Sequence, residues 1–168
     1  CQVIKNAGYT PIATSLAKEP HYWFEFAIYN HDSAKTHTTV PEAVDDAAGE
    51  AWQAGLADIK DLYEKGFLSE NTNTATGDEV FQSFLEGKSA FYLDGSWKMG
   101  GIKEGTATTA LKNGAEIDES SLTNLEKDAL AMPKDTTGIT GAVQDLVTQD
   151  ERAPIFDNMP QIVEGQTE

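Results

Sequence analysis

The chain has 168 residues, which is enough for one domain with its own hydrophobic core. It carries 28 acidic and 12 basic residues, a formal charge of −16, so its surface repels nucleic acids and anionic membranes. No apolar run approaches the length of a membrane span, and the opening CQVIKNAG lacks the pattern of a signal peptide.

The single cysteine, Cys1, has no partner for an internal disulfide and lies in no zinc-binding spacing. A lipid anchor at Cys1 is one alternative. Residues 2–7 instead predict the last turns of a helix that ends at Gly8, whereas anchored chains usually continue with a flexible linker. We therefore favour a small buried cysteine on an interrupted helix, in a chain that begins within a larger protein.

The first part of the chain predicts a strand and a helix. Residues 9–14 predict a short strand, and Pro11 favours an edge or a strand start. Pro20 suits the first position of a helix over about residues 21–30, whose wide apolar set predicts burial on most sides. Residues 30–41 have the composition of a loop.

The clearest element is a helix of more than 20 residues that follows Pro41 and ends at Gly66. Apolar side chains recur along it every three or four residues: Val44, Ala48, Trp52, Leu56, Ile59 and Tyr63. We expect this face, including Trp52, to pack in the core.

The next segments predict another alternation of helix and strand. Residues 69–77 form a polar loop whose spacing does not fit calcium. Asp78 is expected to cap a short helix that ends at Gly87, with inward-facing Val80, Phe81, Phe84 and Leu85. Ser89 to Leu93 predict a buried strand, and Gly95-Ser96-Trp97 begins a helix that reaches about Ile102.

The rest of the chain is weakly patterned. A strand is predicted at residues 129–133, a helix around 142–148, and an irregular tail over 153–165. Strands alternating with helices predict an α/β fold, yet they are too few for a complete doubly wound domain. We expect residues 1–168 to form one α/β lobe of a larger protein, with its core in residues 1–135 and a poorly patterned part in 136–168.

No nucleophile elbow, phosphate-binding loop, dinucleotide fingerprint or zinc-protease motif occurs. His31 and His37 lie in a polar loop, which favours a solvated surface role. We expect neither an enzyme nor a cofactor or metal, although a divergent glycosidase stays open as an alternative because carboxylates are abundant.

Aromatic side chains beside polar turns are the main functional signal. Tyr22 and Trp23 follow Glu19-Pro20, and Trp97 follows Asp94-Gly95-Ser96. Aromatic rings suit the apolar faces of sugars, while carboxylates and backbone amides suit the hydroxyls. Both clusters fall at strand-to-helix junctions, where open α/β sheets bind ligands. Trp97 favours a ligand contact over core packing, and Trp23 suits either role.

Three segments, in order, resemble a known family: Gly8 to Ala13, Ile59 to Leu68, and the most specific, FLEGKSAFYLDGSW from Phe84 to Trp97. They are similar to the extracellular solute-binding proteins of ABC importers, in the family that includes the maltose-binding proteins. The resemblance covers roughly residues 1–102. It implies the helix-rich second lobe of a two-lobed, type II periplasmic-binding fold that closes on its ligand.

The resemblance also implies a site. Trp97 would stack on the sugar, with Asp94, Gly95 and Ser96 forming its turn, and Glu19 and the residues after it would contact the ligand. His21 stands where the family has an aromatic residue after Glu-Pro, which leaves the register of Tyr22 and Trp23 and the identity of the sugar open.

The implied partners are a small carbohydrate and a membrane permease. The complete protein would be a monomer, periplasmic or membrane-anchored outside the cell as a lipoprotein. A non-sugar ligand such as a peptide, an amino acid or a polyamine is the alternative, and an interaction module with an exposed Trp97 is another.

Overall fold

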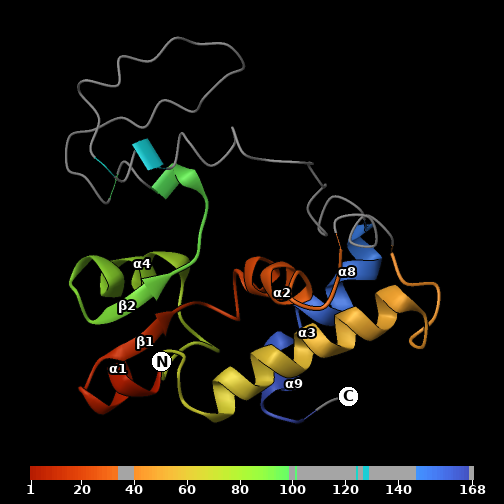
Figure 1. Cartoon of the computed structure of the whole chain (residues 1–168), viewed down its shortest axis with the longest axis horizontal. Coiled ribbons are helices and arrows are strands. Elements are labelled where there is room, and N and C mark those ends of the chain that lie inside the picture. Colours follow the sequence, from red (N-terminus) through yellow and green to blue (C-terminus); the bar gives the residue numbers. More distant parts are fainter. Residues whose placement is uncertain (34–39, 99–100, 102–123, 125–126, 129–146, 167–168) are drawn as a thin grey trace. The chain divides into compact units, whose positions relative to one another are not determined.

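The structure is a computed structural model that describes residues 1–33, 40–98, 101, 124, 127–128 and 147–166. The chain divides into two compact units (Figure 1). The first comprises Cys1–Asp94 and Thr140–Glu168, and the second comprises Gly95–Ile139. Except for the short 3₁₀ helix η1, Ser96–Lys98, every element named below belongs to the first unit.

A small parallel sheet lies in the first unit. Strand β1, Thr10–Ala13, pairs with β2, Ser89–Tyr92, so that Thr10 lies opposite Ser89 and Ile12 opposite Phe91. Ile12 also forms a parallel bridge with Leu68, and its N–H donates to the carbonyl of Phe67 at 3.0 Å. Because β1 has backbone partners on both sides, Pro11 marks a strand start and not an edge.

Four helices precede or surround this sheet: α1, Gln2–Asn6; α2, Pro20–Ile28; α3, Ala47–Glu64; and α4, Gly77–Leu85. The predicted helix start at Pro20 is confirmed. The predicted stops at Gly8, Gly66 and Gly87 are also confirmed, and each of these glycines has the positive φ that suits the end of a helix.

The long helix α3 has 18 residues, fewer than the sequence predicts. It begins at Ala47 because Asp46 caps it, accepting the Gly49 N–H at 2.7 Å. Val44 therefore lies before the helix and is 74% exposed, so its predicted place on the buried face is wrong.

The cap of α4 also differs from the prediction. Thr76, not Asp78, is its N-cap residue: the Thr76 hydroxyl accepts the Glu79 N–H, and the Glu79 carboxylate accepts the Thr76 N–H. Asp78 lies in the first turn, where its charge suits the helix dipole. Leu85 is exposed, so only the other three predicted inward residues pack inside.

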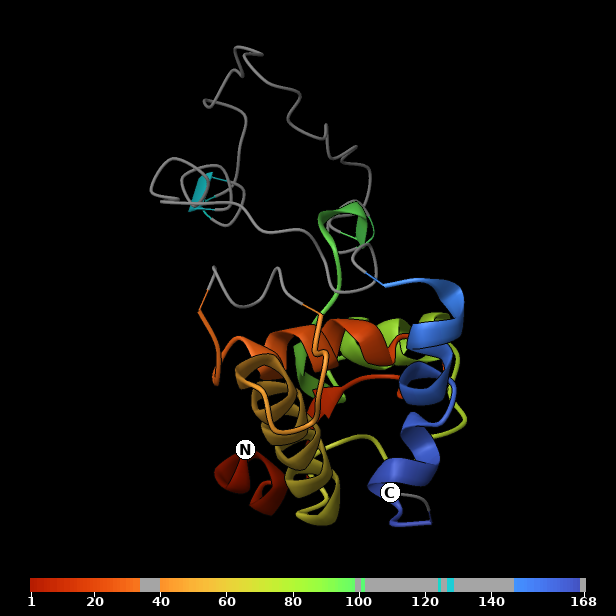
Figure 2. The same ribbon diagram turned by 90° about the vertical axis from the view of Figure 1, so that its right-hand side faces the viewer.

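The C-terminal residues form two helices, where the sequence predicts an irregular tail. They are α8, Gln149–Phe156, and α9, Met159–Val163. Thr148 is the N-cap residue of α8 and does not belong to a preceding helix. Figure 2 shows α8 and α9 following one another along the same side of the first unit. The predicted strand at 129–133 and residues 142–146 of the predicted helix lie outside the described residues.

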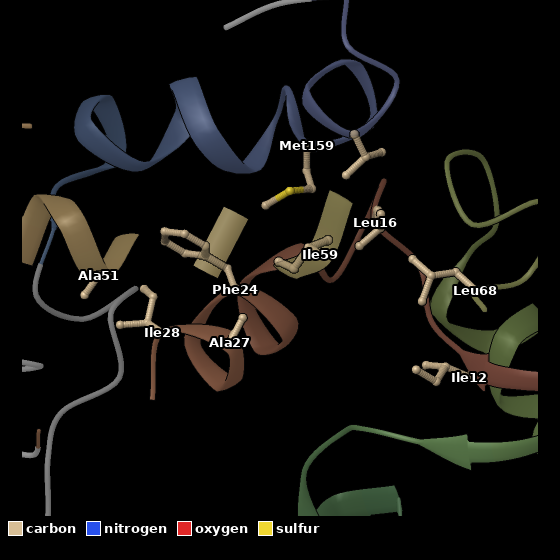
Figure 3. Packing of buried hydrophobic residues seen from close by; sticks show 10 residues of the cluster. Ile12, Leu16, Phe24, Ala27, Ile28, Ala51, Ile59, Leu68 and Met159 are labelled. Carbon is tan, nitrogen blue, oxygen red and sulfur yellow. The ribbon is translucent and has the colours of Figure 1, made fainter. Parts of the chain in front are cut away.

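The main core lies between α2, α3 and α9 (Figure 3). Phe24, Ile28, Ile59 and Met159 are each no more than 1% exposed, and Met159 extends from α9 toward Phe24 and Ile59. Trp52 packs against this cluster, as predicted. The C-terminal residues are thus part of the core that the sequence analysis confines to residues 1–135.

Three expectations of burial are wrong. Phe26 is 54% exposed, so α2 is not buried on most sides. Phe91 is 55% exposed and Ala90 is also exposed, because within the described residues β2 pairs with β1 alone and is an edge strand. Cys1 is exposed, since α1 buries none of its residues.

Candidate functional site

The carboxyl ends of β1 and β2 bring together four of the predicted site residues. The chain after β1 leads to Glu19, His21 and Tyr22 at the start of α2, and the chain after β2 leads to Asp94. Parallel strands end at the same edge of a sheet, which is where α/β folds place their ligands.

Glu19 lies against the N-terminus of α4. A Cβ atom at Gly77, the first residue of α4, would come within 2.2 Å of Glu19 Oε1. The Glu19 carboxylate therefore occupies the space that a side chain at position 77 would fill. A negative charge is favourable there because the N-terminal end of a helix carries a partial positive charge.

Asp94 is held by a residue that the sequence analysis missed. The Tyr92 hydroxyl donates a hydrogen bond to Asp94 Oδ2. The Tyr92 ring packs on Phe81 and Phe84, with centroids 5.4 and 5.5 Å away. Burial raises the pKa of Tyr92, and the hydrogen bond to Asp94 and the negative charges of Asp94, Glu19 and Asp78 raise it further. The spacing Tyr-x-Asp at the end of the strand is the only sequence signal for this pair.

Tyr22 shares the same electrostatic environment. Burial raises the pKa of Tyr22, and the charges of Asp94 and Glu19 raise it further. The His21 ring lies 4.1 Å from the Tyr22 ring, centroid to centroid. Burial and the positive charge of Arg152 lower the pKa of His21, while Asp94 acts in the opposite direction. Arg152, on α8, is a second residue that the sequence analysis missed.

Trp23 points away from this group. It packs against the main core cluster and makes an edge-on contact with Phe26, at 6.1 Å between centroids. Its indole Nε1 is buried and has no hydrogen-bond partner among the described residues. The structure thus favours core packing for Trp23, the second of its two predicted roles.

Gly95, Ser96 and Trp97 belong to the second unit. Trp97 is 64% exposed, and a Cβ atom at Gly95 would come within 2.2 Å of its ring, so the ring lies over the glycine in the space that a side chain there would fill. The Lys98 N–H closes the turn on the Gly95 carbonyl at 3.1 Å. The role of Trp97 as a ligand contact stays a prediction.

The four grouped residues suit polar recognition: two carboxylates, a phenol and an imidazole provide acceptors and donors around aromatic faces.

Within the described residues, no cluster of three or more histidine, cysteine or acidic side chains could hold a metal ion. In the same part of the chain, no helix has the length and apolar character needed to cross a membrane.

No family model matches the chain, and neither the curated proteins nor the solved structures contain a match to it.

Proposed function

We propose that this chain is a ligand-binding lobe of an ABC-importer solute-binding protein, of the type II periplasmic-binding fold, and that it captures a carbohydrate. The observation that carries the proposal is the grouping of Glu19, Tyr22 and Asp94 at the carboxyl ends of two parallel strands. The resemblance of residues 84–97 to the family adds to it, since that segment contains β2, Asp94 and Trp97.

The chemistry suits a sugar. Carboxylates accept hydrogen bonds from hydroxyl groups, and aromatic rings cover the apolar face of a pyranose. An exposed tryptophan at the end of a glycine turn is the kind of side chain that a ligand covers. In the proposed two-lobed protein, the ligand would favour the closed form by binding it more tightly than the open one. The closed form would then dock on a membrane permease, and the lobe itself would do no chemistry.

The direct test titrates a panel of neutral oligosaccharides by calorimetry and by tryptophan fluorescence. We expect saturable binding, and a loss of at least tenfold in affinity in Trp97→Ala. The matched control is Trp52→Phe, which alters a core tryptophan away from the site and should keep its affinity. Unchanged affinity in Trp97→Ala would remove Trp97 from the site, and release of a cleaved sugar would identify a glycoside-active enzyme instead.

A cationic ligand such as a polyamine is the second candidate. The charges of Glu19, Asp94 and Asp78 all act on Tyr92, so negative charge is concentrated around an aromatic cluster. Such an arrangement attracts ammonium groups. Competition separates the two candidates: spermidine that binds, and that a sugar does not displace, would favour the polyamine.

A further inference from the structure

A pocket lies beside His21, within the first unit. It is enclosed by the chain before α2, by the start of α2 and by α8, and has a volume of about 220 Å³. Its polar lining comes from Lys18, His21, Gln149, Arg152 and Asp157, and its apolar wall includes Phe156. The His21 and Phe156 rings are 5.9 Å apart, centroid to centroid, which fixes one wall of the pocket.

The charge of this pocket is opposite to that of the chain as a whole. The chain carries −16, yet the lining has two permanent cations, Lys18 and Arg152, and one acid, Asp157. Arg152 is the only arginine in the sequence, and it is half-buried. Burying part of a guanidinium without neutralising its charge costs free energy. A hydrogen-bond acceptor beside Arg152, and above all an anionic one, would therefore stabilise it.

Protein groups do not provide a charged acceptor within the described residues. Arg152 donates one hydrogen bond, at 3.0 Å, to the neutral amide oxygen of Gln149. Neither Arg152 nor Lys18 forms an ion pair with a carboxylate in the described part of the chain. Lys65 and Lys88 differ, because each pairs with an acidic neighbour, Asp61 and Glu86.

His21 completes a set of donors. Burial and Arg152 lower its pKa, so the imidazole is largely neutral at pH 7 and can donate one hydrogen bond. A guanidinium, an ammonium and an imidazole N–H around one pocket match the acceptor oxygens of an anion, and arginine binds carboxylates and phosphates through two parallel bonds.

We propose that the pocket between Lys18, His21 and Arg152 binds a small anionic group, a carboxylate or a phosphate, with Arg152 as its main anchor. This site needs neither Trp97 nor the proposed carbohydrate function. An anionic group placed there would neutralise Arg152 and accept hydrogen bonds from all three side chains.

Calorimetric titration of the whole chain at low ionic strength tests the proposal with three probes: inorganic phosphate, D-glucuronate and D-glucose. Glucuronate and glucose differ by one carboxylate, so glucose is the neutral control. We expect saturable binding of phosphate, of glucuronate or of both, and a loss of that binding in Arg152→Gln. Any binding of glucose belongs to the proposed carbohydrate site and should be unchanged in Arg152→Gln, because a neutral sugar needs no cation. Phosphate alone would assign the site to phosphorylated solutes, and glucuronate alone to carboxylates.

Two variants with the same change of charge separate a specific site from general attraction. Arg152→Gln should lose at least tenfold in anion affinity. Lys65→Gln removes an exposed cation that is paired with Asp61 and should change affinity less than twofold. Equal losses in both variants, or no saturable binding of either anion to the unmodified chain, would overturn the proposal.

Nuclear magnetic resonance of the unmodified chain provides a second readout if Arg152→Gln fails to fold. The charges of Arg152 and Asp94 act on the His21 pKa, while Lys18 and Asp157 line the same pocket and the Tyr22 ring packs on His21. An anion bound beside Arg152 adds negative charge near the ring, so it should raise the pKa of His21 as phosphate is added. A His21 titration curve that phosphate leaves unchanged, or that sodium chloride at the same ionic strength shifts as much as phosphate does, would overturn the site.

Discussion

The carboxylate of Glu19 fills the space beside Gly77 that a side chain would occupy, with a Cβ position 2.2 Å from Oε1. This packing ties the turn after β1 to the start of α4. It also places a negative charge near Tyr22 and Tyr92, because Glu19 raises the pKa of both phenols.

Gly77→Ala should displace Glu19 without a large loss of stability. The carboxylate ends a flexible side chain that can swing away, so the added methyl group requires no shift of the backbone. The pKa of Tyr22 should then fall toward its ordinary value as the charge of Glu19 moves away. Titration of the tyrosine ring carbons by nuclear magnetic resonance measures this shift. In a Glu19→Gln background the same substitution should have no further effect, and a Tyr22 pKa unchanged by Gly77→Ala alone would contradict the packing.

Tyr92→Phe should destabilise the fold by about 1–2 kcal/mol, because it removes a hydrogen bond to a half-buried carboxylate. Urea unfolding followed by circular dichroism measures the change. Tyr9→Phe is the matched control: Tyr9 is 55% exposed, and its variant should stay within about 0.5 kcal/mol of the unmodified chain. Equal stability of the two variants would mean that the Tyr92 hydroxyl contributes nothing.

Folding stability should decline in alkaline solution. The pKa of Tyr92 is raised in the folded chain, so the unfolded chain releases this proton first, near the ordinary value of 10.0. The stabilising contribution is complete below that pH and is lost as pH rises toward the folded pKa. Urea unfolding at increasing pH should show a steeper decline in the unmodified chain than in Tyr92→Phe. Parallel declines would argue against the raised pKa.

Acid should destabilise the fold through His21. Its pKa is lowered in the folded chain, so the unfolded chain takes up a proton first as pH falls below the ordinary value of 6.5. The contribution is complete above that pH and is lost below it, toward the folded pKa. His21→Gln should flatten this part of the stability profile, whereas Val3→Ala, at an exposed position without a titratable group, should retain it. A profile that His21→Gln leaves unchanged would contradict the assignment.

Met159→Ala should cost about 2–5 kcal/mol, because it leaves a cavity among Phe24 and Ile59 in the core. The exposed Val3→Ala should change stability by less than about 0.5 kcal/mol. Thermal and urea unfolding provide both values. A small cost at Met159 would mean that α9 is not part of the main core.

Local signals in the sequence predicted much of the fold. Glycines at positions 8, 66 and 87 end helices because each takes a positive φ, and Pro20 begins α2 because its missing N–H is not needed there. The apolar repeat along α3 identified Trp52 as a core residue. These signals act over a few residues, so they can be read without the rest of the structure.

Several of the wrong predictions depend on partners distant in sequence. Ser89 to Leu93 suggested a buried strand, but within the described residues β2 pairs with β1 alone, and Phe91 is exposed. The weakly patterned tail suggested irregular structure, but α9 takes Pro160 in its first turn and buries Met159 against helices from the first half of the chain. Arg152 and His21 likewise meet only because α8 returns to the start of α2.

The placement of β1 has a consequence for biosynthesis. This strand leaves the ribosome before its two neighbours, at Leu68 and at Ser89–Tyr92, and the core beside it is completed later still by Met159. The long stretches of chain between these elements must form loops before any of these contacts can stabilise the sheet. Closing such long loops slows folding. The first unit therefore completes its folding only after its C-terminal helices have been synthesised, and until then β1 depends on chaperones or on its own solubility.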